Sequence, residues 1–105
     1  MVKVYREKNE VDSGIPYKVY IDNIAVFDLI EEEIKNIRLE PGVHKISAKS
    51  EKYKSNEVEF EETGEGIIEF LVEPDYTNNA ISKFFTNTLY GKTGIKVTMT
   101  KEFYI

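Results

Sequence analysis

The 105-residue sequence contains no cysteine and only one histidine, His44. The absence of cysteine excludes a disulfide framework and any thiolate metal site. A single histidine excludes multi-histidine metal sites and leaves little for acid–base chemistry near neutral pH. We therefore expect a noncatalytic protein that has no metal site and needs no cofactor.

Long apolar runs are also missing. Runs such as Ile67-Ile68 and Phe70-Leu71-Val72 are short and separated by Glu69, whereas a membrane-spanning helix needs about 20 apolar residues. The first residues alternate and carry charges, unlike a signal peptide. We expect no membrane insertion by this chain. A cytoplasmic location is expected by default, and an envelope-associated one if a flanking segment is absent from this sequence.

Basic residues are too few for a nucleic-acid partner, because the net charge is −5 and phosphates require a basic surface. The charges are unevenly spread along the chain. Residues 1–55 are balanced, residues 56–75 carry eight acidic and no basic side chains, and residues 76–105 have a net charge of +3. This distribution suggests that the acidic middle and the basic end lie close together in the fold, but the favoured interpretation is that the acidic residues form a solvated strand face.

Apolar and polar residues alternate in short segments along most of the chain, as half-buried strands require. The inward-facing sets are Val2 and Val4; Tyr17, Val19 and Ile21; Phe27 and Leu29; Ile37 and Leu39; His44, Ile46 and Ala48; Val58 and Phe60; Ile68, Phe70 and Val72; and Ile95, Val97 and Met99. About seven to eight short strands at this spacing predict a mainly β protein, a small two-sheet β-sandwich. A partly open barrel is the alternative. The length favours a single domain over residues 1–105.

Turn chemistry separates these segments. Asp22-Asn23 is a natural tight turn, because both residue types tolerate left-handed backbone angles. The run of three glutamates at 31–33 predicts a solvated turn that leads into a strand. Pro41-Gly42 has the residues of a type II turn and predicts a hairpin-like connection over residues 39–44.

One segment has a helical rather than a strand-like period. Between Pro74 and Gly91 the apolar residues Ala80, Ile81, Phe84, Phe85 and Leu89 fall on one helical stripe. We predict a C-terminal helix at about 78–90, before a last strand. Because Ile67 and Leu71 make the preceding strand apolar on both faces, this helix is expected to cover them.

Four segments give the sequence a family resemblance: residues 3–6 (KVYR), 17–23 (YKVYIDN), 39–46 (LEPGVHKI) and 55–60 (SNEVEF). They resemble PEGA-like domains and related small bacterial β-sandwich domains of unknown function, over about residues 2–73. The resemblance implies a noncatalytic accessory module that is appended to other domains or membrane segments. It supplies no catalytic residues, and it does not extend to residues 76–105.

Protein association or domain presentation is therefore the favoured function. The alternative is a carbohydrate- or peptide-binding module that uses the exposed tyrosines Tyr5, Tyr20 and Tyr53, because aromatic side chains anchor such ligands. His44 lies on the face of Ile46 and is expected at the rim of the core, hydrogen-bonded to a backbone carbonyl.

Self-association is expected through an edge strand that lacks protective charge. The final strand, with Thr98, Thr100 and the apolar end at 103–105, is the predicted edge.

Overall fold

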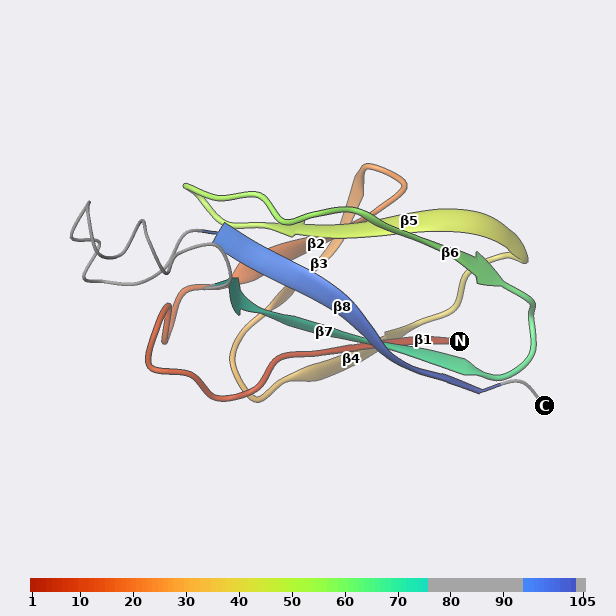
Figure 1. Ribbon diagram of the computed structural model, residues 1–105, viewed down its shortest axis with the longest axis horizontal. Helices are drawn as coiled ribbons and strands as arrows, with labels where there is room; N and C mark the ends of the chain where they lie inside the picture. Colours follow the sequence, from red (N-terminus) through yellow and green to blue (C-terminus); the bar gives the residue numbers. More distant parts are fainter. Residues whose placement is uncertain (76–93, 104–105) are drawn as a thin grey trace.

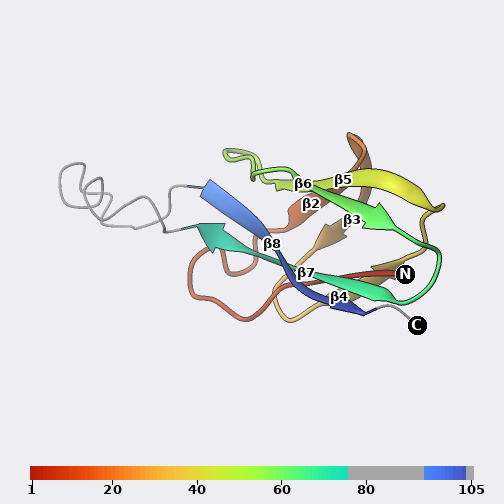
Figure 2. The same cartoon turned by 45° about the vertical axis from the view of Figure 1, so that its right-hand side comes forward.

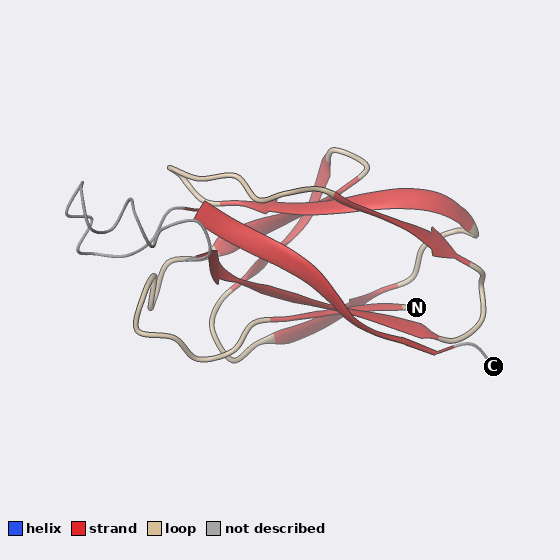
Figure 3. Cartoon of the chain, viewed as in Figure 1, coloured by secondary structure: helices blue, strands red, loops and turns tan. Residues whose placement is uncertain are grey.

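Eight β-strands form two four-stranded sheets that pack face to face (Figure 1, Figure 3). The computed structural model describes residues 1–75 and 94–103, and within these ranges there is no helix. The strands are β1 (Val2–Tyr5), β2 (Tyr17–Ile21), β3 (Ile24–Leu29), β4 (Ile34–Ile37), β5 (Gly42–Lys49), β6 (Val58–Glu62), β7 (Ile67–Asp75) and β8 (Gly94–Phe103). The prediction of a mainly β chain with two stacked sheets is confirmed.

The two sheets differ in how their strands pair. The first sheet has the order β4-β1-β7-β8, and β1 runs parallel to β7, so that Val4 lies opposite Phe70. The second sheet has the order β3-β2-β5-β6 and is entirely antiparallel. After β1 the chain enters the second sheet for β2 and β3 and returns to the first sheet for β4. It enters the second sheet again for β5 and β6 and returns for β7 and β8. Parallel pairing always needs such a crossover.

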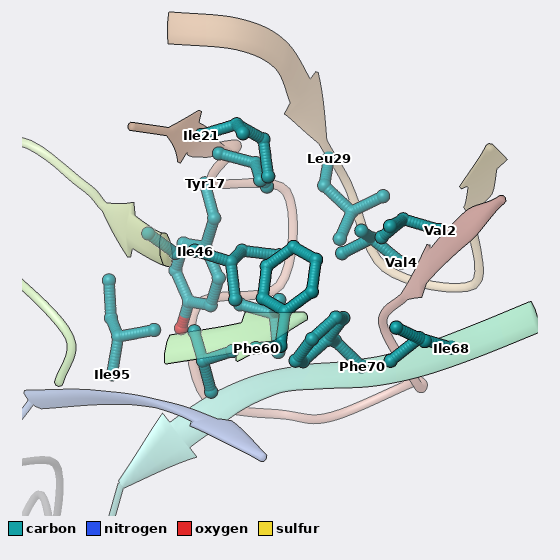
Figure 4. Close-up of a cluster of buried hydrophobic side chains, with 14 residues drawn as sticks. Val2, Val4, Tyr17, Ile21, Leu29, Ile46, Phe60, Ile68, Phe70 and Ile95 are labelled. Carbon is teal, nitrogen blue, oxygen red and sulfur yellow. The ribbon is translucent and has the colours of Figure 1, made fainter. Parts of the chain in front are cut away.

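The core lies between the sheets and is built from the residues that the alternation places inward. The buried apolar side chains are Val2, Val4, Ile68, Phe70, Val72, Ile95 and Val97 from the first sheet, and Tyr17, Val19, Ile21, Leu29, Ile46, Ala48 and Phe60 from the second. The rings of Phe60 and Phe70 meet at the middle with centroids 5.0 Å apart (Figure 4). Burial of these apolar surfaces drives the two sheets together.

Strand β8 closes one side of the sandwich. It crosses diagonally from the level of β5 and β6 to the end of β7 (Figure 1, Figure 2), and it contacts β5 as well as its ladder partner. The Asn56 side chain pairs with the backbone of Val97, accepting from its N–H at 2.9 Å and donating to its carbonyl at 3.0 Å. At Val97 this amide takes the place of a neighbouring strand, and Ser55 forms an isolated parallel bridge with Ile95.

Two predicted turns have the expected backbone. Asp22 and Asn23 have φ of 53° and 67°, as a two-residue hairpin turn between β2 and β3 requires. The glutamate turn at 31–33 precedes β4, with Glu32 at φ 65°. The hairpin predicted at Pro41-Gly42 is wrong, because this turn joins β4 of the first sheet to β5 of the second.

The acidic middle and the basic end do lie side by side, because β7 pairs with β8, and Glu57, Glu59 and Glu61 are exposed as a solvated face requires. Glu73 of the acidic middle lies 3.9 Å from Lys96 of the basic end, and Glu69 is the ladder partner of Lys101. The predicted helix at about 78–90 lies outside the described residues. Its expected contact surface is present, since Ile67 and Leu71 are half-buried on the outer face of β7.

Candidate functional site

The three candidate tyrosines lie on different parts of the molecule. Tyr5 is on the outer face of the first sheet and Tyr20 is on the outer face of the second. Tyr53 lies in the loop between β5 and β6, where it packs against the core and lines a hollow of about 420 Å³. The alternation predicted the outward faces of Tyr5 and Tyr20 correctly. The structure nevertheless brings no two of the three into one site.

Tyr5 belongs to an apolar row across the first sheet. Its ladder partners are Ile34 on β4 and Leu71 on β7. Ion pairs border this row on both sides: Lys3 and Glu69 are 3.8 Å apart on one side, and the Lys96–Glu73 pair lies on the other. An apolar patch with a charged border is a common contact surface. It is also the face that the predicted helix is expected to cover.

His44 bridges two turns. Its Nδ1 lies 2.6 Å from Asp22 Oδ2, and its Nε2 lies 2.7 Å from the carbonyl oxygen of Glu40. Both partners are acceptors, so both ring nitrogens satisfy them only when each carries a proton. The hydrogen bond to Asp22, followed by the one to Glu40, raises the pKa of His44 above its usual value. Both hydrogen bonds therefore favour the imidazolium form of the ring.

The Asp22 carboxylate, the partner of His44, is also held in place by hydrogen bonds. Asp22 accepts the backbone N–H of Lys45 at 2.9 Å, and its own N–H donates to the Lys45 carbonyl. The hydrogen bond from His44, followed by that from the Lys45 N–H, lowers the pKa of Asp22. With both its nitrogens engaged, His44 has no free position for proton transfer. Its predicted rim position and carbonyl contact are confirmed, whereas its bond to Asp22 was not predicted.

Arg6 is a buried cation that the sequence interpretation missed. Only 2% of it is exposed, and its guanidinium donates to the carbonyls of Ile15, Leu29 and Asp12 at 2.6, 3.0 and 2.8 Å. The guanidinium carbon also lies 3.8 Å from the centre of the Tyr17 ring, a favourable cation–π distance. The Tyr17 hydroxyl in turn bonds to the Asp12 carboxylate. Arg6 therefore ties the loop after β1 to the end of β3.

The sequence did contain a signal for this role. Arg6 follows Val2 and Val4 at a spacing of two, so the same alternation that buries the valines points Arg6 inward. An arginine at an inward position requires hydrogen-bond acceptors around it. The carbonyl-rich loop of residues 9–16 supplies two of the three, and the site is structural.

The four edge strands differ in the features that protect them from pairing with another chain. β8 is an edge strand as predicted, but Asn56 covers Val97, and a register shift places Thr100 in a bulge. β6 presents alternating glutamates, and β4 is only four residues long. From β4, Lys35 reaches to 5.7 Å from the ring of Phe27.

Strand β3 and the shorter β4 carry one charged residue each, the fewest of the four edge strands. In β3, the residues Ile24, Ala25, Val26 and Phe27 are uncharged, and Ile24 is 66% exposed. A register shift at Val26 twists the strand, and a hollow of about 200 Å³ runs beside Ala25 and Phe27. Natural edges use bulges and charge to avoid pairing, and β3 has a bulge at Val26 but no charged residue before Asp28.

A polar groove marks the outer face of the second sheet. Two neighbouring hollows, of about 280 and 310 Å³, share Tyr20 and Lys49 in their walls. The first is also lined by Lys54 and Glu57. The ammonium of Lys49 lies 5.7 Å from the centre of the Tyr20 ring. Of the two predicted tyrosines on the sheet faces, Tyr20 is thus the one beside a hollow with charged side chains.

The described parts of the chain contain neither a metal-binding cluster nor a membrane-spanning helix. No group of three or more His, Cys, Asp or Glu side chains in residues 1–75 and 94–103 is placed to hold a metal ion. None of the described segments forms a helix of the length and apolarity that crossing a bilayer requires.

Comparison with known proteins adds no relative. No family model matches the sequence, and no curated protein and no solved structure shows significant similarity to it. The resemblance to PEGA-like domains therefore stays a prediction. Function has to be inferred from the surface chemistry of the two sheets.

Proposed function

We propose that this chain is a noncatalytic β-sandwich module for protein association, and that the edge of β3 is its contact strand. The observation that carries the proposal is the uncharged run from Ile24 to Phe27 at an open sheet edge. Such an edge presents unpaired backbone N–H and C=O groups to solvent, and a second strand satisfies them by extending the sheet.

A second copy of the chain fits this edge. Two β3 strands that pair antiparallel about Val26 place Asp28 of each copy opposite Ile24 of the other. The charged residue of one strand then meets an apolar residue, and the two carboxylates stay apart. Asp28 is already paired within its own copy, 3.6 Å from Lys18. This arrangement is a two-fold, isologous contact of the kind that most homodimers use.

The proposal keeps the sequence prediction that the chain associates through an edge strand, but it assigns the contact to β3 instead of β8. The sequence predicts self-association at the last strand, but there the Asn56 side chain already occupies the backbone N–H and C=O of Val97. The resemblance to PEGA-like domains supports the same noncatalytic role, in which the sandwich presents a neighbouring domain or holds a partner. A carbohydrate- or peptide-binding role, the alternative, would have to use a single tyrosine, because Tyr5, Tyr20 and Tyr53 lie on different parts of the molecule.

Sedimentation velocity over a concentration series tests the proposal. We expect the wild-type chain to form a dimer with increasing concentration. Ala25→Lys adds a charge to the exposed edge of β3 and is expected to weaken the dimer at least tenfold. Thr98→Lys, the matched change on exposed β8, and removal of residues 103–105 are expected to leave it intact.

Two results would contradict this assignment. One is a wild-type chain that stays monomeric at every concentration. The other is a dimer that survives Ala25→Lys but is lost with Thr98→Lys, which would return the contact to β8. Circular dichroism of each variant confirms that the fold is retained, since both substituted side chains are exposed.

A further inference from the structure

Three lysines form a row across the outer face of the second sheet. Lys18 of β2 is the ladder partner of Lys49 on β5, and Lys49 is in turn bridged to Lys54 in the following loop. The charge of Lys18 is balanced by Asp28, at 3.6 Å. Lys49 and Lys54 form no ion pair within the described part of the chain. Like charges directly opposite each other destabilise a strand pair, so an anion bound between them would relieve a repulsion.

The neighbouring row provides a ring surface and hydrogen-bond donors. Tyr20 is the ladder partner of Ser47, and its ring lies beside the Lys49 ammonium. The Ser47 hydroxyl and the Asn23 amide line the same hollow and make no hydrogen bond to another described residue. Their donors and acceptors are free to bind a ligand.

Two acceptors complete the groove. Glu57 lines the first hollow and Glu51 lines the second, and neither carboxylate forms an ion pair in the described chain. Carboxylates accept hydrogen bonds from hydroxyl groups, and aromatic rings stack on the apolar faces of flat or ring-shaped ligands. A ligand that uses every feature of the groove carries hydroxyl groups, a ring face and negative charge.

We propose that this groove binds an acidic oligosaccharide, a chain of sugars that bear carboxylates. Lys49 and Lys54 pair with the sugar carboxylates, Tyr20 stacks on one ring, and Glu57 accepts from sugar hydroxyls. Each of the two hollows is small for a ligand pocket, and together they suit two adjacent sugar rings. This site lies on a sheet face and is separate from the β3 edge proposed for association.

The groove favours a sugar over a nucleic acid. A nucleic acid is a continuous polyanion, and the whole chain carries a net charge of −5. The strand next to the groove presents Glu59 and Glu61 on exposed positions, which would repel a long phosphate backbone. A short acidic sugar needs only Lys49 and Lys54, because Asp28 in the second hollow is already paired with Lys18 at 3.6 Å.

Titration of the ¹⁵N-labelled full chain with tetragalacturonate tests this site. We expect amide shifts confined to residues around Tyr20, Ser47 and Lys49. The methyl ester of the same oligomer, which keeps the sugar rings but removes the charge, is expected to bind at least tenfold more weakly. Single-stranded RNA of similar charge is the third ligand and is expected to bind more weakly than tetragalacturonate.

Matched variants assign the contacts. The double substitution Lys49→Gln and Lys54→Gln is expected to reduce affinity for tetragalacturonate at least tenfold, and Tyr20→Ala to do the same. Tyr5→Ala, on the opposite sheet, is expected to change nothing. Equal binding of the methyl ester, tighter binding of RNA, or the absence of shifts at millimolar tetragalacturonate would each overturn the assignment.

Discussion

The His44 bridge predicts a pH dependence of stability whose sign follows from its geometry. Both ring nitrogens face acceptors, Asp22 Oδ2 at 2.6 Å and the Glu40 carbonyl at 2.7 Å. A neutral imidazole carries one N–H and can donate to only one of them. Deprotonation therefore breaks one of the two links between the β2–β3 turn and the turn before β5.

The magnitude is limited by solvent. A hydrogen bond that involves a charged group contributes about 1.5–3 kcal/mol when buried, whereas an exposed ion pair contributes about 0.2–1 kcal/mol. The His44 side chain is 16% exposed, but the Asp22 side chain is 45% exposed, so screening reduces the larger figure. We expect a loss of about 1 kcal/mol on deprotonation, or about 5 °C in Tm for a domain of this size.

The sign is set by the direction of each shift. The pKa of His44 is raised, so its contribution is complete below the unfolded value of 6.5 and is lost as pH rises through the folded pKa. The pKa of Asp22 is lowered, so its contribution is present above 3.8 and is lost as pH falls through its folded pKa. The bridge is fully formed between these two unfolded-state values.

Urea unfolding at about pH 5.5 and about pH 9, on wild type and His44→Gln, measures the effect. We expect the wild type to lose about 1 kcal/mol more than the variant between the two conditions. NMR titration of the ring is expected to give a His44 pKa above 6.5. The reasoning is refuted if the two proteins show the same pH dependence, or if the ring titrates below 6.5.

Two further substitutions test the structural contacts. Arg6→Met removes the donors from the carbonyls of three residues and is expected to reduce the free energy of unfolding by about 2–4 kcal/mol, since the Leu29 carbonyl has no access to water. The exposed Arg38→Met is its control, and equal effects in urea unfolding would contradict the role given to Arg6. Asn56→Ala removes both bonds to Val97 and is expected to cost about 1–2 kcal/mol. In Asn56→Ala the Val97 amide should also exchange its hydrogen faster. The control Asn36→Ala should leave the free energy of unfolding and this exchange rate unchanged.

Local patterns predicted the strands well, because alternation is a property of neighbouring residues. Ile68, Phe70 and Val72 are buried as expected, since a strand places every second side chain on one face. The turn at Asp22-Asn23 was equally predictable from the sequence, because its left-handed angles depend on two residue types alone.

Long-range pairing was not predictable from these patterns. Pro41-Gly42 correctly indicated a turn, but the strand that β5 joins is decided by burial against distant residues. The parallel pairing of β1 with β7 is of the same kind, because alternation is identical in parallel and antiparallel strands.

In the candidate site, too, the local features were predictable from the sequence and the long-range contacts were not. Alternation placed Tyr5 and Tyr20 outward, but it carries no information about which sheet each strand enters. The opposition of Lys49 and Lys54 depends on the course of the loop between β5 and β6. The bond between His44 and Asp22 joins residues 22 positions apart, and only the β2–β5 pairing brings them together.

Hydrogen–deuterium exchange at low and high protein concentration tests the assignment of β3 as the contact strand. Exchange reports which backbone amides become hydrogen-bonded when chains associate. We expect slower exchange at high concentration in Ile24–Leu29 and unchanged exchange in Gly94–Phe103. Protection that appears in β8 instead, or no concentration dependence in either strand, would contradict the account.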